Sequence, residues 1–358
     1  MVWDIFCRVI DNFGDVGVCW RLAAGLARRG QSVRLWIDDG RALAWLAPGG
    51  AAGVQVIDWA EPAPDLAPGA VVIEAFGCAP PPGFVARMAR MARMARARPA
   101  PVWINLEYLS AEPYVERSHG LLSPQFSGPG AGLKKWFFYP GFTPATGGLL
   151  RGGSAGEPAT DARLAGLAWA HAQGWGAGPG EQAITVFCYQ NPALPALLQA
   201  LAGPPTLLRV PPGPALAALQ GMALPSGMRL QALPYLRQLD FDRLLAAADL
   251  NLVRGEDSFV QAQCGADAPF LWQVYPQHDG AHAPKLEVFL DLYLRGNPTG
   301  PADAVRAAFR AFNGLCAWPA ALPDRTGWLA LQRRWQQCLG SQTDLCSQLI
   351  GFVDQKRG

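Results

Sequence analysis

Short apolar segments that favour strands alternate with helix-forming segments along most of this chain, and this alternation constrains the fold more than any other feature. Strands separated by helices form parallel sheets with helices on both faces. We expect strands at 2–9, 32–37, 54–57, 71–74, 102–105, 183–188, 206–210, 250–253 and 270–274. Helical patterns lie between them, at 18–29, 193–202, 240–248, from about 257, and at 283–294.

The length of the chain indicates two domains. Its 358 residues exceed one ordinary α/β core and suit two domains of about 150 residues each. We expect an N-terminal domain over 1–150, a linker rich in Gly, Ala and Pro over 151–180, and a C-terminal domain over 181–340. The tail, 341–358, is expected to pack back on the first domain. The predicted fold class is α/β, with two doubly wound Rossmann-like domains that face each other across a ligand-binding cleft.

Composition excludes several classes of function. Charged residues make up 16% and the net charge is +2, so the whole chain has no bias towards nucleic acid or anionic membrane. No uncharged apolar run approaches the roughly 20 residues of a membrane helix, and we see no signal peptide, so we expect a cytoplasmic protein. Eight cysteines without a CxxC pair or a Cys/His cluster argue against a metal site and a disulfide framework.

A repeat of Arg, Met and Ala covers 87–96 within a helix-forming segment. Its period of three residues distributes the arginines around the axis of a helix with 3.6 residues per turn. We therefore expect a solvated surface helix rather than a nucleic-acid site.

The loop 11–17 (Asp-Asn-Phe-Gly-Asp-Val-Gly) follows the first expected strand. Ligands of open α/β sheets bind at the carboxyl ends of strands, and glycines permit their close approach. Asp11 and Asp15 could bind a cation or accept a proton there. They could equally cap the helix that we expect to begin near Val18, so both interpretations stay open from this loop alone.

A second polar segment, 253–258 (Val-Arg-Gly-Glu-Asp-Ser), lies between a buried strand and a helix. A helix start with free backbone N–H groups suits a diphosphate, and Arg254 can bind phosphate with a fork of donors. The alternative is a simple capped helix with a surface salt bridge. We favour a binding site, because an arginine, a glycine and capping residues converge at one strand end.

Aromatic residues near these loops could hold a nucleotide base. They are Phe187, Tyr189, Tyr235 and Phe241. On spacing alone, each is more often a core residue. The four histidines form no triad or metal pattern, and the chain lacks the G-x-S-x-G motif of serine hydrolases.

Several segments together resemble the EarP family, the bacterial arginine rhamnosyltransferases of elongation factor P. The similar segments are 3–15, 103–112, 139–143, 147–150, 241–245, 251–260 and 275–277. They occur in order over most of the chain. Two positions depart from the family pattern: the segment 264–269 looks longer, and Gln273 replaces a frequent histidine.

The resemblance implies a GT-B glycosyltransferase that uses TDP-β-L-rhamnose without a metal or other cofactor. It implies inverting transfer to an arginine of elongation factor P, which activates that factor for the rescue of ribosomes stalled at polyproline. The implied partners are the donor and this protein substrate, with no nucleic acid and no membrane. Two alternatives are a GT-B enzyme with another acceptor and a non-catalytic nucleotide-binding protein; the acidic loop speaks against the second.

The resemblance also implies roles for individual residues. Asp11 and Asp15 match an essential acidic pair, and Glu256 an essential glutamate. A guanidinium needs a carboxylate to orient it and take a proton, a role that we assign to Asp15, with Asp11 positioning. The base-binding aromatics would be Phe187, Tyr235 and Phe241; the diphosphate contacts Tyr189, Arg254, Asp257 and Ser258; and possible acceptor or sugar contacts Asn12, Phe13, Gly14 and Glu107.

Overall fold

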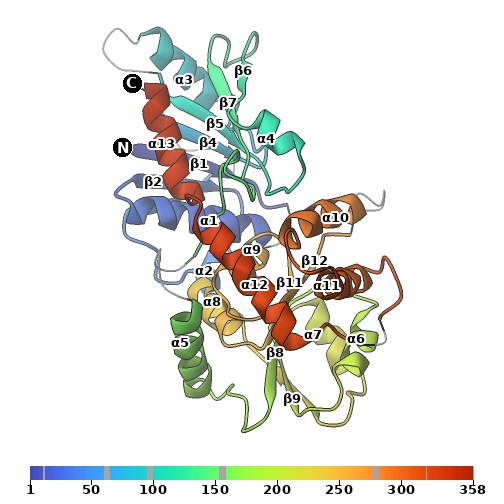
Figure 1. Ribbon diagram of the computed structural model, residues 1–358. Helices are drawn as coiled ribbons and strands as arrows, with labels where there is room; N and C mark the ends of the chain where they lie inside the picture. The colour runs from blue at the N-terminus through green and yellow to red at the C-terminus, as the bar shows by residue number, and fades with distance from the viewer. Residues whose placement is uncertain are drawn as a thin grey trace. The chain divides into compact units, whose positions relative to one another are not determined.

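A computed structural model describes residues 1–10, 13–59, 65–94, 100–152, 159–276, 282–319 and 321–357. The chain forms two compact units. The first consists of Met1–Leu150 together with Gln342–Gly358, and the second of Arg151–Ser341. In Figure 1 the first unit therefore contains both the blue start and the red end of the chain.

The first unit is built on a seven-stranded sheet in the order β3-β2-β1-β4-β5-β7-β6. Neighbouring strands are parallel, except that β6 runs antiparallel to β7. The strands are β1 (Val2–Cys7), β2 (Ser32–Ile37), β3 (Val54–Asp58), β4 (Val71–Ala75), β5 (Val102–Leu106), β6 (Leu122–Pro124) and β7 (Lys134–Phe138). The helices are α1 (Gly14–Arg28), α2 (Leu43–Leu46), α3 (Pro82–Arg93), α4 (Tyr114–Ser118) and α13 (Leu345–Arg357).

Helices cover both faces of this sheet (Figure 1). Successive side chains of a strand point to opposite faces, so Ile5 packs in a cluster with α1 and α13 while Phe6 packs with α3. The Arg-Met-Ala repeat falls partly on α3. Met88 and Ala89 are buried there and Arg90 is exposed, so this surface helix is amphipathic: one face packs on the sheet and the other meets solvent.

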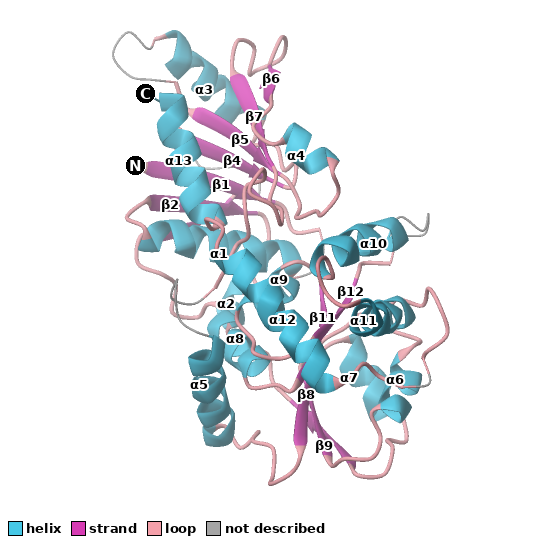
Figure 2. Cartoon of the chain, in the orientation of Figure 1, coloured by secondary structure: helices cyan, strands magenta, loops and turns pink. Residues whose placement is uncertain are grey.

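The second unit holds a five-stranded parallel sheet in the order β10-β9-β8-β11-β12, whose strands Figure 2 shows in magenta. Its strands are β8 (Gln182–Val186), β9 (Thr206–Val210), β10 (Met228–Ala232), β11 (Leu250–Arg254) and β12 (Phe270–Gln273). Its helices are α5 (Ala159–Ala172), α6 (Leu194–Ala200), α7 (Pro214–Gln220), α8 (Gln238–Ala246), α9 (Asp257–Cys264), α10 (His282–Tyr293), α11 (Thr299–Phe312) and α12 (Arg325–Gly340). The segment expected as a linker thus contains α5, which belongs to this unit.

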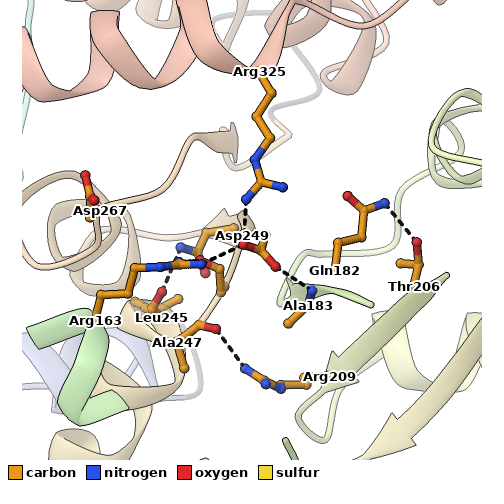
Figure 3. A network of polar contacts seen from close by, with 12 residues as sticks. Arg163, Gln182, Ala183, Thr206, Arg209, Leu245, Ala247, Asp249, Asp267 and Arg325 are labelled. Carbon is orange, nitrogen blue, oxygen red and sulfur yellow. Dashed lines mark hydrogen bonds and ion pairs between the residues drawn. The ribbon is translucent and has the colours of Figure 1, made fainter. Parts of the chain in front are cut away.

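A carboxylate between α8 and β11 ties several elements of the second unit together. Asp249 accepts hydrogen bonds from Arg163 of α5 at 2.6 Å, from Arg325 of α12 at 2.5 Å and from the backbone N–H of Ala183 at 2.8 Å (Figure 3). Burial alone would raise the pKa of Asp249, but these three donors hold it below its ordinary value. Asp249 therefore stabilises the unit in its ionised form.

The two sheets confirm the expected doubly wound fold, and their strand orders locate one switch point in each sheet. In the first sheet the chain adds β2 and β3 on one side of β1 and β4 on the other; in the second, β9 and β10 lie on one side of β8 and β11 on the other. Ligands bind beyond the carboxyl ends of the strands at such switch points. These ends carry the two polar segments that the sequence indicates.

Candidate active site

The second switch point carries an arginine held between aromatic rings. Arg254 ends β11, and its guanidinium carbon lies 4.7 Å from the ring centroid of Phe187 and 4.4 Å from that of Tyr189. Both rings follow the neighbouring strand β8. Within the described residues, the buried Nε of Arg254 finds no hydrogen-bond partner. The rings therefore hold a cation whose N–H groups are not saturated by the protein.

More aromatic rings extend this cluster. Phe241 of α8 meets Phe187 edge to face at 5.0 Å between centroids, and Tyr275 meets Tyr189 in the same way at 5.3 Å. Tyr235, after β10, is exposed. The structure thus brings four predicted residues into one cluster: Phe187, Tyr189, Phe241 and Arg254. Tyr275 belongs to the same cluster, and in the sequence only its place in the similar segment 275–277 indicated it.

The start of α9 lies directly after Arg254. Glu256 occupies the N-cap position, and its side chain forms no capping hydrogen bond. The carboxylate of Asp257 accepts hydrogen bonds from Gln238 at 3.0 Å and Gln261 at 3.3 Å, and the hydroxyl of Ser258 donates to the carbonyl of Arg254. The Ser258 contact ties the helix start to β11, and the Gln238 contact ties it to α8.

Gly255 makes the turn from β11 to α9 possible. Its φ of +65° is a left-handed conformation that glycine adopts without a steric cost. The indole of Trp272, on the neighbouring strand β12, donates to the Gly255 carbonyl at 3.1 Å. The turn is therefore held by both its backbone conformation and a side-chain bond.

The acidic loop lies at the first switch point. Asp11 and Asn12 fall outside the described residues. Helix α1 begins at Gly14 rather than near Val18, so buried Asp15 lies in its first turn instead of capping it. Its Oδ2 accepts a hydrogen bond from the backbone N–H of Ile10 at 3.0 Å. Asp15 thereby ties the first turn of α1 to the backbone at Ile10.

Two aromatic contacts flank this switch point. Phe13 occupies the N-cap position of α1 and meets Trp45 edge to face at 5.1 Å. Phe76, which follows β4, has a φ of +57°, the sole positive φ outside glycine among the described residues. Its ring stacks on Tyr108 with 4.2 Å between centroids. A bulky residue in this conformation is strained, and such strain concentrates at functional sites.

Glu107 follows β5 and is half-buried. Its Oε1 accepts a hydrogen bond from Asn105 Nδ2 at 2.6 Å. Burial raises the pKa of Glu107, while Asn105 and Lys135 oppose that rise. Beneath it, Glu74 of β4 accepts from Lys135 Nζ at 3.0 Å, and burial raises the pKa of Glu74 as well. Glu74, Asn105 and Lys135 were not predicted as site residues. A glutamate inside the apolar strand β4 was the signal for Glu74, and Asn105 was marked by its place in the similar segment 103–112.

No helix in the described chain combines the length and apolar character needed to cross a bilayer. No group of three or more His, Cys, Asp or Glu side chains among the residues placed by the structure is arranged to hold a metal ion.

Comparison with known proteins decides the family. Residues 3–354 match the family described as elongation factor P (EF-P) rhamnosyltransferase EarP. The chain belongs to the EarP family. It is 41% identical to the protein-arginine rhamnosyltransferase of Pseudomonas aeruginosa and 43% identical to that of Pseudomonas putida, each match covering 98% of both chains.

Solved structures agree with this family assignment. A structure described as the basis for EarP-mediated arginine glycosylation of translation elongation factor EF-P matches with a TM-score of 0.65 at 30% identity, over 99% of both chains. The spinosyn rhamnosyltransferase SpnG matches with a TM-score of 0.52 at 14% identity, over 99% of this chain and 100% of its own, which shows the fold alone. The EarP-family chain is therefore a glycosyltransferase with the GT-B fold, as its sequence predicts.

Proposed function

We propose that this protein transfers rhamnose from TDP-β-L-rhamnose to an arginine side chain of elongation factor P. The observation that carries the proposal is Arg254, a cation held between Phe187 and Tyr189 with an unpartnered Nε at a switch point. That arrangement suits an anionic nucleotide. The acceptor and the sugar follow from relatives named protein-arginine rhamnosyltransferase.

The donor binds to the second unit. Phe187, Tyr235 and Phe241 offer ring faces and edges for the thymine base. Tyr189, Arg254, Asp257 and Ser258 surround the start of α9, where the helix dipole favours the diphosphate. The carboxylate of Asp257 is already bound by Gln238 and Gln261, which reduces its repulsion of the phosphates.

The acceptor guanidinium binds to the first unit. A cation with five N–H donors suits carboxylates at a strand end, and Asp11, Asp15 and Glu107 supply three. We assign proton removal to Asp15, with Asp11 positioning the guanidinium. Asn12, Phe13 and Gly14 follow Asp11 in the sequence, and we assign them to contacts with the acceptor or the sugar.

One displacement accounts for the chemistry. A guanidinium nitrogen attacks C1 of rhamnose, the C1–N bond forms, and the bond from C1 to the diphosphate oxygen breaks. The guanidinium proton passes to Asp15, and TDP leaves with the electron pair of the broken bond. Arg254 and the start of α9 stabilise its negative charge, so the reaction needs no metal. Attack opposite the leaving group inverts C1, and Glu256 assists by binding sugar hydroxyls or the acceptor.

The acceptor fixes the biological setting of the proposal. Elongation factor P acts in translation, so the enzyme works in the cytoplasm. Rhamnosylation activates the factor for ribosomes stalled at polyproline. Neither nucleic acid nor a membrane takes part in the reaction itself.

The test measures the intact mass of unmodified elongation factor P after incubation with the protein and TDP-β-L-rhamnose. We expect a single gain of one deoxyhexose, located on arginine by fragmentation and inverted at C1 by NMR. TDP binding and turnover without this gain would move the function to another acceptor. TDP binding without any donor consumption would indicate a non-catalytic nucleotide-binding protein.

A further inference from the structure

Two buried oxygens in the first unit have no hydrogen-bond partner among the residues that the structure describes. Glu74 is 2% exposed and Asn105 is 6% exposed. Glu74 Oε1 and Asn105 Oδ1 form no hydrogen bond with any described residue. The other polar atom of each side chain is hydrogen-bonded: Glu74 Oε2 accepts from Lys135, and Asn105 Nδ2 donates to Glu107. Two unpartnered acceptors inside a core are costly unless a proton lies between them.

The sheet places these two side chains next to each other. Glu74 and Asn105 are directly paired residues of the parallel strands β4 and β5. The neighbours Ile73 and Ile104 pack on the α1 side of the sheet, so Glu74 and Asn105 lie on the α3 side. Paired residues on one face of a sheet are close enough for their side chains to interact.

A proton on Glu74 satisfies both oxygens at once. A protonated carboxyl donates from Oε1 to Asn105 Oδ1 and still accepts from Lys135 at Oε2. Burial raises the pKa of Glu74, in the direction that this state requires, although the ammonium of Lys135 and the indole N–H of Trp103 oppose that rise. The amide of Asn105 then has a fixed orientation, with Nδ2 directed at Glu107. With this bond added to the two observed ones, the four side chains form one continuous chain of hydrogen bonds from the sheet interior to the half-buried Glu107.

We infer that the chain Lys135–Glu74–Asn105, here named the buried column, positions Glu107 to bind the acceptor guanidinium. The inference rests on the proposed function, because it needs Glu107 to contact the acceptor. Glu107 stands just beyond the end of β5, where the strand no longer holds its side chain. Charged groups that bind a substrate keep their geometry through supporting hydrogen bonds of this kind.

Variants separate positioning from general stability. Glu74→Gln keeps both bonds, because its amide donates to Asn105 Oδ1 and accepts from Lys135. Glu74→Met removes both. Because Glu74→Met leaves the partly buried Lys135 ammonium without its partner, the double variant Glu74→Met/Lys135→Met is made alongside it. Asn105→Leu breaks the column one step closer to Glu107 with little change in volume.

Steady-state kinetics with elongation factor P and TDP-β-L-rhamnose give the readout. We expect the acceptor KM to stay within about twofold for Glu74→Gln and to rise about tenfold for the other three variants. The donor KM should not change. Asn105→Leu should also move the acidic limb of the acceptor kcat/KM to higher pH, because Asn105 lowers the pKa of Glu107. Lost packing alone would not move that limb.

Two results would overturn the inference. An unchanged acceptor KM in the Met and Leu variants would show that the column does not act on the acceptor. An equally large rise in the acceptor KM of Glu74→Gln would show that the charge of the column matters and not its hydrogen bonds. A wild-type protein that transfers no rhamnose overturns the proposed function instead, and is recognised before any variant is assayed.

Discussion

The guanidinium carbon of Arg254 lies over the ring of Tyr189, 4.4 Å from its centroid. This contact depends on the flat shape of the guanidinium, which a lysine ammonium lacks. We expect Arg254→Lys to weaken binding of TDP about tenfold to a hundredfold, measured by titration calorimetry. Arg306→Lys, a surface arginine paired with Glu287, is the control and should bind TDP normally. Normal TDP binding by Arg254→Lys would remove Arg254 from the donor site.

Replacement of Asp15 by asparagine removes the charge of the side chain but keeps its hydrogen bond with the backbone. Asparagine at this position still accepts the hydrogen bond from the Ile10 N–H through its amide oxygen. We therefore expect Asp15→Asn to bind TDP-rhamnose normally and to reduce transfer to elongation factor P at least about a hundredfold, as expected for loss of a general base. Intact-mass time courses measure the transfer. Substantial transfer by this variant would assign proton removal elsewhere.

Asp249→Asn should destabilise the second unit at neutral pH. It leaves Arg163 and Arg325 without their carboxylate, at a cost of about 2–3 kcal/mol in the free energy of unfolding. The folded-state pKa of Asp249 is lowered, so its stabilisation is present above the ordinary value of 3.8 and is lost as the pH falls below it. Denaturant unfolding should therefore show that the difference in unfolding free energy between the wild type and Asp249→Asn is smaller at pH 3 than at pH 7.

The matched control for that variant is Asp291→Asn. Asp291 pairs with Arg306 near the surface, with 66% of its side chain exposed. Such exposed pairs contribute about 1 kcal/mol or less. Equal losses of unfolding free energy in Asp249→Asn and Asp291→Asn would show that the Asp249 contacts stabilise the protein no more than a surface ion pair does.

Gly148→Ala should loosen the C-terminal tail from the first unit. Gly148 has a φ of +72°, and a Cβ there would overlap the carbonyl oxygen of Thr343 just before α13. Gly30→Ala is the control, since Gly30 has a φ of +79° and open space around it. We expect about 1 kcal/mol of destabilisation for the control from backbone strain, and at least about 3 kcal/mol for Gly148→Ala. Thermal unfolding and proteolysis of the tail measure the difference; equal effects would contradict the tail contact.

Much of the fold could be predicted because each central strand of the two sheets is a short apolar run that the sequence alone marks. β2, at 32–37, and β9, at 206–210, have the bounds that the sequence indicates. The strands β6, β7 and β10 were missed, since they are short, edge-lying or only partly buried and lack a clear apolar run. Helices α11 and α12 were missed because neither strands nor a distinct motif mark their bounds.

The candidate site was predictable only in part. Loops at strand ends could be located from the sequence, so Arg254 and Asp15 were found. The rings that surround Arg254 and the column beneath Glu107 depend on strand order, which brings distant segments together. The spacing of residues along the sequence does not indicate which of them become neighbours in this way. The catalytic and binding roles stay predictions until the variants are measured.

The position of α13 has a consequence for how the protein is made. Leu345, Leu349 and Val353 complete the core of the first unit, and Asp344 binds Arg29 at 2.9 Å. The second unit is one continuous segment that ends before these residues. A ribosome that builds the chain from its N-terminus therefore delivers the whole second unit before the first can close its core. The first unit can therefore complete its core only after the second unit has been made, and a chain truncated before Leu345 leaves that core unfinished.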